Sequence, residues 1–132
     1  MQLAVLSLID GALQEGVSAR VLARLAPRCE DPAVRAVVAQ LAADEGRHAA
    51  HGWDVALWCL QEGGEPVAQA LSGATRALPE SLPSGVPDFA RDGTWEARGV
   101  PGTALEDEAN AKARAHLIKQ VEAAVRAAPM AA

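Results

Sequence analysis

Residues 31–64 read DPAVRAVVAQLAADEGRHAAHGWDVALWCLQEGG. The stretch begins with Asp31, a residue type that caps helices with its side chain, and with Pro32, which is favoured in the first helical position. It then continues without a proline to the Gly63-Gly64 pair, a strong signal for the end of a helix. The pattern predicts a single helix of about 31 residues, a length typical of helical bundles.

The segments around this stretch predict more helices. We expect helices over residues 2–26, 65–78 and 104–128, a turn over residues 27–30, and Thr103 as the cap of the last helix. Residues 79–102 contain four prolines and several glycines, which favour an irregular wrap. The sequence therefore predicts an all-α fold in one domain. A long antiparallel helical hairpin occupies residues 1–64, and the wrap and C-terminal helix of residues 65–132 pack on the same core.

Composition excludes several classes of function. Half of the residues are hydrophobic, only 3% are aromatic, and the net charge is −5. No stretch concentrates Lys and Arg, whereas a nucleic-acid surface needs a basic face to replace phosphate counterions. Residues 1–9 are apolar but lack the positive region of a secretory signal, and no apolar run reaches the roughly 18 residues of a membrane span. We expect a cytoplasmic protein that binds neither nucleic acid nor membranes.

One face of the predicted helix over residues 32–62 contains the residues suited to chemistry. Side chains spaced three or four apart form an apolar or small-residue seam that only Glu45 and His48 interrupt. The preceding helix has a similar seam with one carboxylate, Glu15. In an antiparallel hairpin turning near Cys29, Glu15 lies level with Glu45, because both are about equally far from the turn.

A carboxylate buried in such a seam needs a hydrogen-bonded partner or a cation. Two carboxylates and an imidazole suit iron or manganese. The sequence therefore predicts Glu15, Glu45 and His48 as metal ligands.

The same residues also have a purely structural interpretation, because Glu-x-x-His alone is a weak signal. Glu45 is then a solvated charge and His48 a core histidine with satisfied hydrogen bonds. Two neighbours are candidates for positions just outside the ligands. Asp44 either pairs with Arg47 or solvent, or braces an imidazole. His51, one turn beyond His48, is either exposed or contacts the site from an adjoining face.

The runs DPAVR (residues 31–35) and LAADEGRHAA (residues 41–50) resemble the ferritin-like di-iron superfamily, which includes the rubrerythrins. In that family a helix with a bridging Glu precedes a helix with Glu-x-x-His. The resemblance covers about residues 5–62. It implies that Glu15 and Glu45 are carboxylate ligands and His48 the imidazole ligand of iron, with ferroxidase-like or peroxide-reducing activity.

The chain departs from the family in one respect. A complete family site takes two helices with Glu and two with Glu-x-x-His, whereas this chain has one of each. The last predicted helix contains His116, but the residue three positions before it is Ala113 instead of a glutamate. Half a di-iron site remains. Either two copies associate, or a preceding half is missing, or the second half-site has been lost.

We expect a homodimer or larger oligomer that completes a four-helix bundle around a di-iron site, with manganese as the other candidate metal. The alternative is a non-catalytic helical interaction module that kept the ferritin-like fold and lost the metal site.

Overall fold

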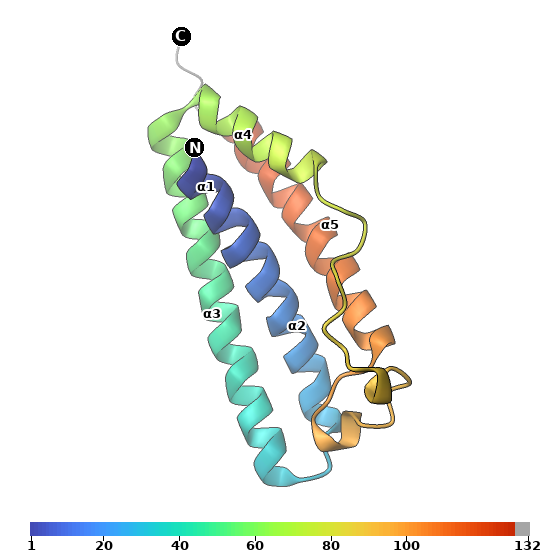
Figure 1. The fold of residues 1–132 in the computed structure, drawn as a ribbon. Coiled ribbons are helices and arrows are strands. Elements are labelled where there is room, and N and C mark those ends of the chain that lie inside the picture. The colour runs from blue at the N-terminus through green and yellow to red at the C-terminus, as the bar shows by residue number, and fades with distance from the viewer. Residues whose placement is uncertain (129–132) are drawn as a thin grey trace.

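The computed structural model describes residues 1–128 and is all-α in that range, as predicted (Figure 1). An N-terminal rod is formed end to end by α1 (Gln2–Leu6), the π-helix η1 (Ser7–Glu15) and α2 (Gly16–Leu25). After the 3-10 turn η2 (Ala26–Arg28), α3 (Pro32–Gly63) returns antiparallel to the rod, followed by α4 (Glu65–Arg76) and α5 (Thr103–Ala127). The last four residues of the predicted segment 65–132 lie outside the described range.

The ends of α3 confirm the sequence signals. The Asp31 side chain accepts hydrogen bonds from the backbone N–H groups of Ala33 (2.8 Å) and Val34 (3.4 Å), and so satisfies donors at the helix start. At the other end Gly64 has a φ of 62°, a conformation that glycine adopts without steric cost.

The prediction that Thr103 caps α5 is wrong. Thr103 is the first helical residue, and the capping position belongs to Gly102, which supplies no side-chain hydrogen bond. Packing explains the glycine, because a Cβ atom at Gly102 would lie 2.7 Å from the Cα of Gly93.

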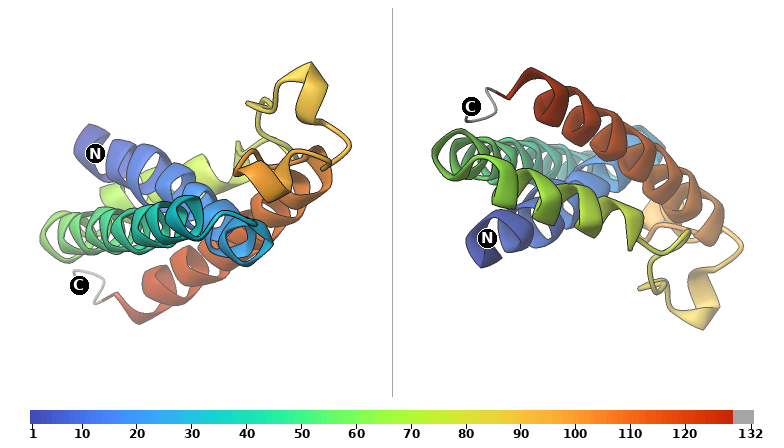
Figure 2. Two further views of the ribbon diagram at one scale, coloured as in Figure 1. Left: turned by 90° about the horizontal axis from the view of Figure 1, so that it is seen from below. Right: turned by 90° about the horizontal axis from the view of Figure 1, so that it is seen from above.

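The main hydrophobic core is formed jointly by the rod, α3, α4 and α5. In Figure 1 the rod has α3 on one side and α4 and α5 on the other. We call the face of the hairpin that α4 and α5 pack against the covered side. Its buried side chains come from all of these elements: Ala4, Leu8, Leu13, Ala56, Leu60, Leu71 and Leu117. In both end-on views of Figure 2, α3 lies between the N-terminal part of the rod and the C-terminal part of α5, and the yellow part of the irregular segment lies away from it.

The π-helix changes which residues of the rod face this core. Leu8 and Leu13 are both buried although they are five residues apart, whereas Val21 and Leu25 follow the usual spacing of four. The wider turn accommodates one extra residue. Leu13 is therefore buried in this core, whereas its neighbour Ala12 is partly buried and packs against it.

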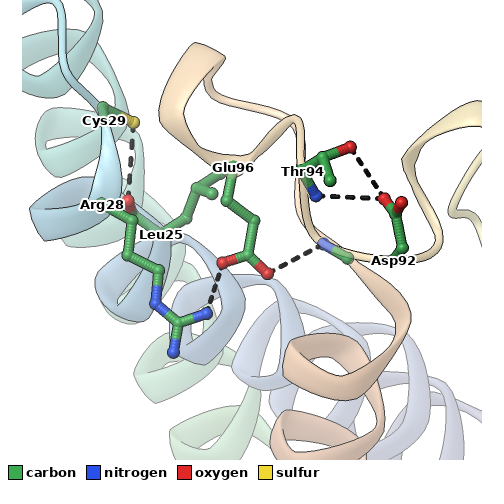
Figure 3. A network of polar contacts seen from close by, with 7 residues as sticks. Leu25, Arg28, Cys29, Asp92, Thr94 and Glu96 are labelled. Carbon is green, nitrogen blue, oxygen red and sulfur yellow. Dashed lines mark hydrogen bonds and ion pairs between the residues drawn. The ribbon is translucent and has the colours of Figure 1, made fainter.

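The irregular segment is tied to the tip of the hairpin. It contains the 3-10 turns η3 (Asp88–Ala90) and η4 (Glu96–Arg98). The buried Glu96 carboxylate contacts the Arg28 guanidinium and accepts a hydrogen bond from the backbone N–H of Gly102, at 3.3 Å (Figure 3). The backbone N–H of Glu30 also donates to the carbonyl of Ala97, at 2.8 Å. These bonds hold the expected wrap in place.

No helix among residues 1–128 combines the length and the apolar character needed to cross a membrane.

Candidate metal centre

The three predicted ligands meet where the rod and α3 run side by side. One ligand atom each from Glu15, Glu45 and His48 lie within 4.8 Å of one another. The His48 Nδ1 is 3.9 Å from the Glu15 Oε2 and 3.9 Å from the Glu45 Oε2. The predicted level pairing across the hairpin is confirmed, and the Glu-x-x-His spacing places Glu45 and His48 one turn apart on α3.

Glycine brings the two helices close enough for these side chains to meet. A Cβ atom at Gly52 would lie 2.7 Å from the backbone nitrogen of Ala12, and one at Gly11 would lie 2.9 Å from the Cα of Gly52. The two backbones are therefore in direct contact one turn from His48. Only residues without a Cβ atom permit this approach.

The π-helix sets the direction of Glu15, its last residue. One inserted residue turns everything after it by about 100° around the helix axis. Beyond this wide turn Leu13 is buried in the core, and the Glu15 carboxylate lies close to His48 of α3.

The expectation that the three ligands are buried is wrong. The exposed fraction of the side chain is 37% for Glu15, 30% for Glu45 and 60% for His48. Leu41, four residues before Glu45 and so on the same face of α3, is exposed as well. The reason lies in the arrangement of the later helices: α4 and α5 pack on the covered side, and within residues 1–128 no helix covers the site. Solvation therefore removes the argument that a buried charge demands a cation, and the convergence of the three groups remains.

An open groove of about 530 Å³ adjoins this site and is lined in part by Glu15 and His48. We call the face of the hairpin that carries this groove and the three candidate ligands the open side. Its lining residues come from the rod and α3: Leu3, Ser7, Gly11, Glu15, His48, His51, Gly52 and Val55.

The two residues predicted next to the ligands have different positions. Asp44 accepts a hydrogen bond from the Gln40 side chain at 3.1 Å and forms an ion pair with Arg47, which agrees with the first of its two interpretations. His51 is exposed and lines the open side, outside the group of three converging ligand atoms.

Sequence reasoning missed the features that position the site. Gly11 and Gly52 were visible in the sequence, but their direct contact depends on how the two helices cross. The π-helix leaves a weaker signal, the five-residue interval between Leu8 and Leu13, which helical periodicity of 3.6 does not anticipate.

Searches of family models, curated proteins and solved structures find no match to this chain. The candidate centre is defined by its own donor set, two carboxylates and one imidazole from neighbouring helices. Oxygen and imidazole nitrogen donors together suit divalent iron and manganese.

Proposed function

We propose that the chain is a ferritin-like metal-binding protein in which Glu15, Glu45 and His48 hold iron, with manganese as the other candidate. The observation that carries the proposal is the convergence of one ligand atom from each residue within 4.8 Å. Carboxylate oxygen and imidazole nitrogen bind divalent first-row ions at about 2.0–2.2 Å, so two ligands of one ion lie roughly 3–4 Å apart. The 3.9 Å separations of His48 Nδ1 from the two carboxylates match that range.

The residues have distinct roles in this proposal. Glu15 and Glu45 balance the charge of the cation, and His48, one turn after Glu45 on α3, supplies an imidazole nitrogen. Iron bound there would supply electrons to O₂ or peroxide, a ferroxidase-like or peroxide-reducing activity. The open side leaves the remaining coordination positions accessible from solvent.

We further propose that two chains pair through the open side and complete a di-iron site. One chain supplies ligands from one direction only, whereas a two-fold axis next to Glu15 brings together four carboxylates and two imidazoles. Exposed leucines support a contact here: Leu3 lines the groove, and Leu41 lies one turn before Glu45 on α3. Exposed apolar groups beside a functional site are typical of interfaces.

The alternative is a non-catalytic helical interaction module that kept a ferritin-like fold without the metal. The exposure of the three side chains favours it, because solvated carboxylates are stable without an ion.

Metal content separates the two proposals. We expect iron or manganese in the natively purified protein, and saturable Fe(II) uptake under anaerobic conditions. Glu45→Ala should abolish uptake while the circular dichroism spectrum is unchanged. Glu62→Ala, an exposed carboxylate on the same helix, is the matched control and should retain the metal. A parent protein without metal affinity, or equal uptake by the Glu45 variant, contradicts the metal-binding proposal.

The oligomeric state tests the pairing. Light scattering at micromolar concentration should show a dimer or larger species, and Leu41→Lys should dissociate it and lower iron stoichiometry. Trp58→Lys is the control, because Trp58 is also exposed (56%, against 46% for Leu41) but points about 100° away from Leu41 around α3. A monomeric parent protein contradicts the pairing and leaves the binding of one ion by one chain to be judged by metal content.

A further inference from the structure

Three arginines follow one another at intervals of four residues near the end of the rod. Arg20 and Arg24 lie one turn apart on α2, and Arg28 follows in η2. Two of them have a carboxylate partner: Arg24 lies 2.9 Å from Glu108, and Arg28 contacts the buried Glu96. Arg20 is half-buried and belongs to none of the ion pairs formed within residues 1–128. Like charges one turn apart destabilise a helix, so Arg20 carries an uncompensated charge.

The helix opposite presents another cation to Arg20. Figure 1 shows that α5 runs antiparallel to α2, and the Arg24–Glu108 pair defines how the two helices are aligned. Arg20, one turn before Arg24, is therefore level with Lys112, one turn after Glu108. The Lys112 ammonium lies 2.8 Å from the same Glu108 oxygen that Arg24 contacts. One carboxylate thus compensates two cations, and none compensates Arg20.

An open hollow of about 230 Å³ lies between these cations, and we call it the basic hollow. Its lining residues are Arg20, Ala23, Arg24, Ala109 and Lys112. Three cations and the one shared carboxylate of Glu108 leave two positive charges, although the whole chain has a net charge of −5. A cleft lined by one sign of charge concentrates ions of the opposite sign.

We propose that the basic hollow binds a phosphate group. A phosphate carries about −1.5 to −2 charges at pH 7, which matches the two positive charges of the hollow. The planar guanidinium of Arg20 donates parallel hydrogen bonds that fit phosphate oxygens, and the Lys112 ammonium adds a point charge from the other wall. The phosphate takes the place opposite Arg20 that Glu108 takes opposite Arg24. The basic hollow shares no lining residue with the open side, so this site is tested independently of the metal proposal.

The phosphate is either the free ion or part of a small phosphorylated molecule. A neighbouring groove of about 400 Å³ shares Arg20 with the basic hollow and is lined by the rod, α3 and α5. Small residues such as Gly16 line it together with Trp53, His116 and Asp54. The body of a phosphorylated molecule would extend from the basic hollow into this groove.

Calorimetric titration of the metal-free full chain tests the proposal, with inorganic phosphate and phenyl phosphate as probes at constant ionic strength. We expect saturable binding of phosphate and none of sodium nitrate, the control for unspecific attraction of anions. About tenfold tighter binding of phenyl phosphate would support a phosphorylated molecule as the ligand, and equal affinity would support the free ion. Absence of saturable binding of both phosphates, or an equal response to nitrate, would overturn the proposal.

Variants then locate the bound phosphate. Arg20→Gln should lower the phosphate affinity about tenfold, because it removes charge-assisted hydrogen bonds. Arg126→Gln removes the same charge at an exposed position outside the hollow and should bind like the parent. Lys112→Gln should also weaken binding, with the exposed Lys119→Gln as its control.

The stability of the Arg20 variant distinguishes binding from a structural role. Without phosphate, Arg20→Gln should be as stable as the parent or slightly more stable, because its repulsion with Arg24 is removed. Added phosphate should raise the Tm of the parent more than that of the variant. An equal loss of phosphate affinity in the Arg20 and Arg126 variants would overturn the proposal.

Discussion

The two sides of the helical hairpin are built from the same helices and have opposite characters. On the covered side, Leu8 and Leu71 are almost completely inaccessible to solvent. On the open side, Glu15, Glu45 and His48 converge in contact with water. The difference shows that helical periodicity defines a face, whereas the elements that pack later decide whether that face is buried. The apolar core and the converging Glu15, Glu45 and His48 side chains therefore lie on different sides of one hairpin.

The largest expected effect is on the covered side. Leu8 is 0% exposed, and truncation to alanine should lower the free energy of unfolding by about 2–5 kcal/mol through lost burial and a cavity. Leu6, two residues earlier and 48% exposed, is the matched control, for which Leu6→Ala should change it by about 0.5 kcal/mol or less. Urea denaturation measures both. Equal losses would show that the rod is buried on both sides, as in an assembled dimer.

The next largest effect concerns the contact between Gly11 of the rod and Gly52 of α3. Gly52→Ala places a Cβ atom 2.7 Å from backbone, so the helices must separate, at a cost of about 1–3 kcal/mol. Gly46→Ala is the control, since a Cβ atom there meets nothing within 4 Å. It should raise the free energy of unfolding by up to about 1 kcal/mol, because alanine has the higher helix propensity. The same sign for both variants in thermal or urea denaturation would contradict the proposed role of the contact.

Local signals in the sequence were enough to predict most of the fold. The Asp31-Pro32 start and the Gly63-Gly64 end of α3 depend on bonds within a few residues, and both are confirmed. Thr103 was mispredicted because the tertiary contact between Gly93 and Gly102 determines that position. The π-helix was not predicted, since it depends on how the rod crosses α3.

The sequence predicted which three residues converge at the candidate site, but not that their side chains are exposed to solvent. Glu15 pairs with Glu45 because the two residues are separated from the turn by about equal numbers of residues. In an antiparallel hairpin this number alone decides which residues lie side by side. Burial depends on where α4 and α5 lie, and nothing within residues 1–64 specifies that. Metal binding and pairing of two chains stay predictions.

A smaller effect on the free energy of unfolding is expected when Glu45, on the open side, is replaced in the metal-free protein. The carboxylates of Glu15 and Glu45 repel each other, and at this separation in a solvated site the repulsion is about 1 kcal/mol or less. Glu45→Gln should therefore leave the metal-free protein as stable as the parent, or slightly more stable, in urea denaturation with a chelator. With Mn(II) added, only the parent should gain stability. A loss well above 1 kcal/mol in the metal-free variant would assign Glu45 a structural role.

The smallest effect concerns an exposed contact between the rod and α5. The Glu108 carboxylate lies 2.8 Å from the Lys112 ammonium and 2.9 Å from the Arg24 guanidinium. The hydrogen bond from Lys112 lowers the pKa of Glu108 below its ordinary value of 4.5, with the charge of Arg24 acting in the same direction. A carboxyl group whose pKa is lower in the folded state stabilises the fold above its unfolded pKa, and this contribution disappears as the pH falls through the lowered value.

Glu108→Gln should therefore lower the Tm slightly at neutral pH, and the difference from the parent should shrink as the pH falls below 4.5. Thermal unfolding followed by circular dichroism across this range measures it, with Glu122→Gln as an exposed control on the same helix. The effect should be small, because exposed ion pairs are weakened by solvent and salt. A Tm difference that is constant with pH would mean that the glutamate acts through packing instead of charge. Helices on the covered side would then be joined by apolar burial alone.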